Sequence, residues 1–205
     1  MAVFLFSLSC HEAAHAWTAD KFGDSTGRYL GRITLNPKAH IDVLGTIVFP
    51  LVAYVTGAFM FGWAKPVPVN PLNWRRRSLA NIMTSLAGPA SNFILAIIGI
   101  VIFKIILVSN PTAAANPGIL MKMGSTLLGT LISVNLTLGV FNLVPIPPLD
   151  GSHVLEEFLP YEAALAYDQI RPFGFFLLLG LLYLGLMGLL LRPVFSLVDL
   201  ILFGQ

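Results

Sequence analysis

Residues 78–103 read SLANIMTSLAGPASNFILAIIGIVIF, a run of 26 residues without a charged side chain. A helix of about 20 apolar residues is long enough to cross a bilayer. Three further uncharged runs, at 43–64, 123–149 and 172–191, approach or exceed this length. Of the 205 residues, 56% are hydrophobic and 11% are charged, whereas soluble domains carry about 25% charged residues. The sequence therefore predicts an α-helical membrane protein that crosses the bilayer several times.

The composition also limits the partners and the domain organisation. The formal charge is only +2 and is spread over the loops, so the chain has no basic footprint for nucleic acid. A single cysteine, Cys10, excludes an intrachain disulfide bond. We expect one membrane-embedded domain over residues 1–205, with a core at about 3–155 and a C-terminal helix and tail at 172–205. Such a chain is expected to be a multi-pass protein of the cell membrane, surrounded by the lipid bilayer.

The N-terminal apolar stretch contains an unusual group of polar residues. Residues 11–15 read His11-Glu12-Ala-Ala-His15, and Glu12 is the one charged residue between positions 1 and 19. In the helix expected at about 2–21, residues four apart share a face, so His11 and His15 can bind one metal ion. Ionisable residues inside a membrane need a compensating partner. The pattern therefore predicts one zinc ion per chain.

Glu12 follows the first histidine and can reach a water molecule at an open metal position. Zinc lowers the pKa of such a water to about 7. A neighbouring carboxylate can then take a proton from the water at neutral pH and return it to a leaving amine. Glu12 is therefore the candidate catalytic acid and base.

A catalytic zinc site needs a third protein ligand. Asp150 is the strongest candidate because it follows an apolar run and three prolines and precedes Gly151, where a helix must break. Irregular backbone at membrane depth is tolerated where it lines a wet cavity or is buried in protein. A helix-capping role for Asp150 and a ligand role for His153 remain as alternatives.

Two extended stretches are expected on the cytoplasmic side. One is a strand at 29–35, and the other is an edge strand at 65–71, whose prolines at alternate positions leave one side without N–H groups. The apolar run 43–64 lies between them and has basic loops on both sides, and basic loops are typically cytoplasmic. This run either crosses the membrane or dips into it and returns. The expected fold is an α-helical polytopic membrane protein with about five membrane segments and a small β-sheet on the cytoplasmic side.

The remaining membrane helices are expected at 78–103, 125–144 and 173–191. The first of them carries small residues at spacings of three and four, which is typical of close helix packing: Ser85, Gly88, Asn92, Ala96 and Gly99. The tail after Pro193 is too short to cross and is expected to lie along the membrane interface.

Together, these residues resemble the site-2 protease family of intramembrane zinc metalloproteases, peptidase family M50. One hallmark of that family is His-Glu-x-x-His, found here at 11–15. The other is Asn-x-x-Pro followed by Leu-Asp-Gly, found here at 142–145 and 149–151. The segment 88–92, Gly-Pro-Ala-Ser-Asn, is similar to the small-residue motif of the family. The resemblance covers about residues 3–155 and indicates a compact form without the PDZ or CBS modules of some relatives.

The resemblance implies a role for each matched residue. His11, His15 and Asp150 are expected to bind zinc, and Glu12 is expected to be the acid and base. Asn142 is expected to contact the substrate backbone or the developing oxyanion.

The activity implied is that of a zinc-dependent intramembrane endopeptidase, which hydrolyses peptide bonds of membrane-spanning proteins. An unwound substrate segment is expected to add to the strand around residues 30–35 by β-augmentation. One alternative is a membrane protein that binds or senses metal without proteolysis, although the intact Glu12 disfavours it. A transporter with an intramembrane ion site is a second alternative, disfavoured because the chain shows no internal repeat.

Overall fold

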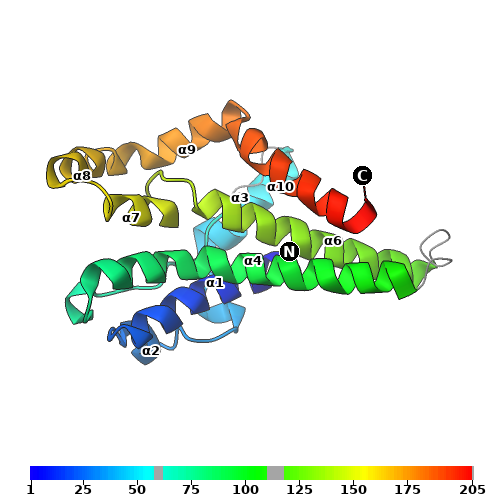
Figure 1. The fold of residues 1–205 in the computed structure, drawn as a ribbon, viewed down its shortest axis with the longest axis horizontal. Helices are drawn as coiled ribbons and strands as arrows, with labels where there is room; N and C mark the ends of the chain where they lie inside the picture. The colour runs from blue at the N-terminus through cyan, green and yellow to red at the C-terminus, as the bar shows by residue number, and fades with distance from the viewer. Residues whose placement is uncertain (58–61, 110–117, 205) are drawn as a thin grey trace. The chain divides into compact units, whose positions relative to one another are not determined.

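The computed structural model describes residues 1–57, 62–109 and 118–204. The chain forms two compact units, Met1–Gly88 and Pro89–Gln205. The helix α4 (Arg77–Ser109) contains the boundary between them (Figure 1).

The first unit is built on α1 (Ala2–Lys21), which has the bounds expected from the sequence. Ten of its 20 residues are buried, so α1 is largely enclosed by protein. Gly27 lies so close to α1 that an added Cβ would come within 3.1 Å of the Cβ of Ala16. The short elements that follow α1 in this unit are α2 (Thr26–Tyr29), η1 (Pro37–Ala39), η2 (Val43–Val48), α3 (Phe49–Thr56) and η3 (Pro71–Asn73).

The apolar run at 43–64 returns to the place where it begins. It forms η2 and α3, and α3 ends at Gly57, whose φ of 69° is left-handed. Beyond residues 58–61, which the structure does not describe, the N–H of Trp63 donates to the Gly45 carbonyl at 3.1 Å. The hydroxyl of Thr46 donates to the Trp63 carbonyl at 2.8 Å. Because the two ends are hydrogen-bonded to each other, the run is a return and not a simple crossing.

The expected β-sheet is absent from the part of the chain that the structure describes. The first expected strand, 29–35, begins as the last residue of α2 and turns at Gly31, where φ is 67°. In the second, 65–71, the prolines have no N–H, and the N–H groups of Lys65, Val67 and Asn70 bond to groups outside any strand. The N–H of Val67 donates to Glu12 and that of Asn70 donates to Asp24. Side-chain acceptors have thus taken the place of a strand partner, and the prediction of a sheet was wrong.

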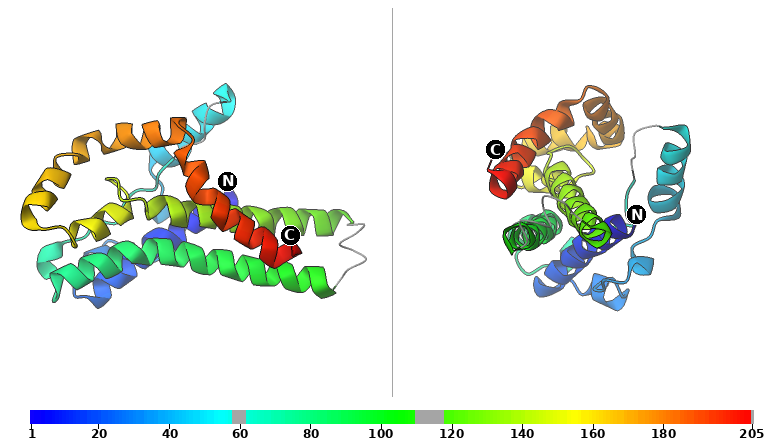
Figure 2. Two further views of the ribbon diagram at one scale, coloured as in Figure 1. Left: turned by 45° about the horizontal axis from the view of Figure 1, so that its top comes forward. Right: turned by 90° about the vertical axis from the view of Figure 1, so that its right-hand side faces the viewer.

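The second unit combines the C-terminal part of α4 with a set of helices that follow it. Buried side chains of α4, α6 and α10 form one cluster, consisting of Ala96, Ile132, Leu136, Val198 and Leu202. Figure 2 shows α10 crossing α6 obliquely, and the two helices are in contact. The helices after α4 in this unit are α6 (Ile119–Asn142), α7 (Asp150–Glu156), α8 (Tyr161–Asp168), η4 (Arg171–Phe173), α9 (Gly174–Tyr183) and α10 (Leu186–Phe203).

The part of the predicted small-residue face of α4 between Asn92 and Gly99 packs against α6. Ala96 and Asn92 are fully buried, and a Cβ on Gly99 would come within 2.9 Å of Ile132 on α6. The Nδ2 of Asn92 donates to the Oδ1 of Asn135 at 2.8 Å, so a buried amide pair links the two helices.

The C-terminal region differs from the sequence expectation. A single helix was expected at 173–191, but the chain breaks at Gly185, whose φ is 70°, and then forms α10 through Pro193. Among the described residues, four helical segments are long and apolar enough to cross a membrane, at 77–109, 119–142, 161–183 and 186–203. The tail is thus long enough to cross, because its helix begins at Leu186, seven residues before Pro193. The chain is a mostly helical membrane protein.

Candidate metal centre

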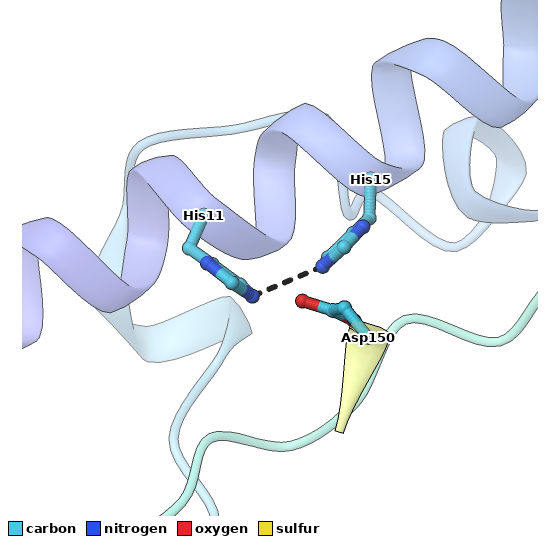
Figure 3. Close-up of side chains that lie close together, drawn as sticks. All are labelled: His11, His15 and Asp150. Atoms are coloured by element: carbon cyan, nitrogen blue, oxygen red, sulfur yellow. Dashed lines mark hydrogen bonds between the residues drawn. The ribbon is translucent and has the colours of Figure 1, made fainter. Parts of the chain in front are cut away.

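Two buried imidazole rings lie side by side on α1. His11 and His15 are 5% and 9% exposed, and their Nε2 atoms are 3.0 Å apart. Figure 3 shows both rings leaving the same face of the helix with these nitrogens turned toward each other. The spacing of four residues in the sequence therefore produces the shared face that was predicted.

A backbone carbonyl fixes the tautomer of His15, that is, which ring nitrogen carries the hydrogen. The Nδ1 of His15 lies 2.6 Å from the carbonyl oxygen of Thr84 on α4. A carbonyl oxygen can only accept, so Nδ1 carries the hydrogen and Nε2 of the neutral ring keeps its lone pair. This outer hydrogen bond is typical of metal-binding histidines, where it fixes the tautomer and the ring orientation.

Gly88 on α4 makes room for the two rings. A Cβ at this position would lie 2.4 Å from Nε2 of His15 and 2.6 Å from Nε2 of His11. Any larger residue would therefore occupy the space next to the two ligand nitrogens. The sequence indicated a small residue here for helix packing, but its contact with the histidines became visible only in the structure.

The histidine pair fits zinc. Tetrahedral zinc with Zn–N bonds of about 2.0–2.1 Å places two ring nitrogens about 3.3 Å apart, close to the 3.0 Å found here. His11 and His15 each offer a ring nitrogen to a metal ion, and zinc binds imidazole nitrogen.

Glu12 is buried on α1 and held by the chain around residue 67. It is 9% exposed, and its Oε2 accepts a hydrogen bond from the N–H of Val67 at 3.0 Å. Arg32, which is 5% exposed, also interacts electrostatically with this carboxylate. Burial lowers the pKa of the Arg32 guanidinium, and the negative charge of Glu12 opposes this change. The carboxylate therefore lies in a site with a backbone donor and a nearby positive charge.

Asp150 belongs to the second unit and is the first residue of α7. The turn before it is tightly packed, because a Cβ on Gly151 would come within 2.2 Å of the Leu143 carbonyl oxygen. The helix N-cap is Leu149, and the helix has no side-chain cap hydrogen bond there. Figure 3 draws Asp150 at the start of α7 and the two histidines on α1.

The other polar candidates lie in the second unit as well. The Nδ2 of Asn142, the last residue of α6, donates to the Leu138 carbonyl at 3.0 Å. The Nδ1 of His153 lies 4.0 Å from an oxygen of Glu156, and its side chain is 37% exposed. His153 is thus partly exposed beside an acidic side chain, as expected for a surface histidine.

The chain matches a known family over most of its length. Residues 1–116 and 103–182 match the model of peptidase family M50. The chain is 38% identical over 196 residues to the "Putative zinc metalloprotease YwhC" of Bacillus subtilis (strain 168). The aligned residues make up 94% of this chain and 83% of that protein.

Two mycobacterial proteins named "Putative zinc metalloprotease Rip2" are also similar. That of Mycolicibacterium smegmatis is 33% identical over 184 residues, or 89% of this chain and 65% of that protein. That of Mycobacterium tuberculosis (strain H37Rv) is 31% identical over 201 residues, or 98% of this chain and 73% of that protein. No solved structure matches the chain.

The family match and the chemistry of the histidine pair agree with each other. The family model covers the segment with His11 and His15 as well as that with Asp150, and the paired nitrogens suit zinc. The chain therefore belongs to peptidase family M50 and is a zinc metalloprotease of the membrane.

Proposed function

We propose that the protein is an intramembrane endopeptidase in which His11, His15 and Asp150 hold one zinc ion. The observation that carries this proposal is the buried histidine pair, with its ligand nitrogens 3.0 Å apart over Gly88. The family match across both segments supports the addition of Asp150 as the third ligand. Two histidines and one carboxylate are a known ligand set for catalytic zinc.

Glu12 is the proposed acid and base. When bound, zinc supplies a Lewis acid and a water of lowered pKa. The Oε2 of Glu12 accepts the Val67 N–H, so Oε1 is the atom proposed to take the proton from the attacking water. The same carboxyl group then gives this proton to the amine that leaves as the peptide C–N bond breaks.

Asn142 is the proposed contact for the substrate carbonyl. Its side-chain amide has two N–H groups, and one of them donates to Leu138. The other can donate to the oxygen on which negative charge develops, which is the role of an oxyanion-hole group.

The proposed substrates are membrane-spanning proteins, and the proposed location is the cell membrane. The support is that the proposed catalytic groups lie in a chain with four helical segments able to cross a bilayer. His11, Glu12 and His15 are themselves buried. A water-soluble peptide would have to leave water to reach these buried groups, whereas a membrane-spanning segment is already in the bilayer.

The test compares wild type with Glu12→Gln in detergent or vesicles. Zinc per chain is measured by elemental analysis, and cleavage is measured on a model transmembrane peptide. We expect the variant to keep its zinc and to cleave roughly 10² to 10⁴ times more slowly, the range for general acid–base catalysis. Full cleavage by the variant would refute the role of Glu12. A wild type that cleaves a soluble peptide equally well would refute the proposed substrate class.

A further inference from the structure

The segment 65–71 reads Lys-Pro-Val-Pro-Val-Asn-Pro and contacts Glu12 through the N–H of Val67. We call it the proline segment. Three of its seven residues are prolines and carry no N–H. A residue that precedes a proline is biased toward extended backbone, and this applies to Lys65, Val67 and Asn70. The sequence thus makes the segment stiff and extended without a strand partner.

Three of the four N–H groups that remain in the proline segment, those of Lys65, Val67 and Asn70, donate hydrogen bonds within the first unit. The N–H of Lys65 donates to the His40 carbonyl at 2.9 Å, and that of Val67 donates to Glu12 at 3.0 Å. In extended backbone these two donors point to the same side, and Pro66 and Pro68 face the other side without a donor. The prolines therefore prevent a second chain from pairing with the side that Pro66 and Pro68 face. The N–H of Val67, on the other side, is hydrogen-bonded to Glu12.

A buried cation fixes the start of the proline segment. The guanidinium of Arg32 donates through Nη2 to the Lys65 carbonyl and through Nη1 to the Ala39 carbonyl, the latter at 2.6 Å. Through these two bonds the buried Arg32 side chain, which is only 5% exposed, links the Lys65 carbonyl to the Ala39 carbonyl.

A buried anion fixes the other end. Asp24 is fully buried, and its carboxylate accepts the Asn70 N–H at 2.6 Å and the Asn73 Nδ2 at 3.0 Å. It also accepts the hydroxyl of Thr26 at 2.5 Å. The proline segment is thus anchored at both ends by buried charged groups, and its middle N–H contacts the proposed catalytic carboxylate.

We propose that the proline segment is a positioning device for Glu12, in which the Val67 N–H fixes Oε2 and thereby directs Oε1. This inference rests on the proposed catalytic role of Glu12. A glutamate side chain has three rotatable bonds, and a misplacement of about 1 Å in a catalytic group costs roughly 100-fold in rate. Arg32 and Asp24 are positioning residues that act through the segment.

The first test is a direct measurement of the hydrogen bond in the zinc-free protein. Hydrogen exchange of the Val67 amide is expected to be slow in wild type and at least about tenfold faster in Glu12→Ala, since a lost acceptor leaves the N–H open to exchange. Equal exchange rates of the Val67 amide in the two proteins would overturn the inference, and this result does not depend on any activity measurement.

The second test is kinetic. Val67→Pro removes the donor to Glu12, and Val69→Pro is the matched control, because Val69 lies in the same segment and its N–H donates to no group among the described residues. We expect kcat of Val67→Pro to fall by about 10- to 100-fold, with KM and zinc content close to wild type. Val69→Pro is expected to keep the wild-type kcat.

A further variant covers the case in which Val67→Pro does not fold. Asp24→Asn replaces one acceptor oxygen of the distant anchor and is expected to lower kcat with zinc retained. Wild-type kcat in a zinc-loaded Val67→Pro, or in Asp24→Asn where the former does not fold, would overturn the inference. Glu12→Gln in the same assay separates the two proposals. If Glu12→Gln is inactive while Val67→Pro is fully active, only the positioning role fails. If Glu12→Gln is fully active, the catalytic role of Glu12 fails as well.

Discussion

Replacement of Gly88 by alanine is the sharpest test of the zinc site, because the contact it creates is with the ligand nitrogens themselves. The added Cβ would lie 2.4 Å from Nε2 of His15 and 2.6 Å from Nε2 of His11. Ordinary contact requires about 3.5 Å, so the rings must move by about 1 Å. His15 cannot move freely, since its Nδ1 is bonded to the Thr84 carbonyl at 2.6 Å.

The expected cost follows from this overlap. Inserting a methyl group into a filled site typically costs about 1–3 kcal/mol, which corresponds to a loss of about 5- to 140-fold in zinc affinity. Zinc sites require ligand distances within about 0.2 Å, so a shift of this size is expected to disturb binding. Alanine favours a helix over glycine by about 1 kcal/mol, so α4 itself is not weakened.

The assay is competition between the protein and a zinc chelator, together with zinc content after dialysis. Gly124→Ala on α6 is the matched control, because a Cβ there meets nothing within 4 Å. The control is expected to bind zinc like wild type and to be at least as stable. If Gly88→Ala binds zinc as tightly as the control does, the placement of the two ligand nitrogens beside Gly88 is wrong.

Two further predictions concern the second unit. Asp150→Ala is expected to lower zinc affinity by about 100-fold or more, because three protein ligands become two. If this variant binds zinc as tightly as wild type in the chelator assay, Asp150 is not a ligand. For the buried pair of Asn92 and Asn135, each single alanine variant is expected to lower the unfolding free energy by about 1–3 kcal/mol, because it leaves the other amide without this partner. Thermal unfolding of both single variants and the double variant forms a cycle, and strictly additive losses would show that the two amides are not coupled.

The sequence predicted the parts of the fold that depend on local patterns. The helix at 2–21 was predicted with the bounds that α1 has, because its apolar run ends at charged residues. Long uncharged runs also indicated the membrane helices that became α4 and α6. The small-residue face of α4 was predicted from spacing alone, and Ala96 and Asn92 on it are fully buried.

The errors came from segments whose structure depends on distant partners. Residues 65–71 look like an edge strand, but a strand exists only if another strand accepts its hydrogen bonds. Here the acceptors are Glu12 and Asp24, which lie 55 and 46 residues away in the sequence from the donors. The break at Gly185 was also missed, because glycine is tolerated in membrane helices and its left-handed φ of 70° cannot be read from an apolar run.

The sequence by itself determined the chemistry of the site: two histidines one helical turn apart, with a glutamate beside them. That much is local, because the helical repeat alone places residues four apart on one face. Only the tertiary structure decided what holds these groups. The Thr84 carbonyl, 69 residues from His15, sets the tautomer, Gly88 leaves space for both rings, and Val67 fixes the Glu12 carboxylate. These contacts join parts of the chain that no local pattern connects, and packing alone brings them together.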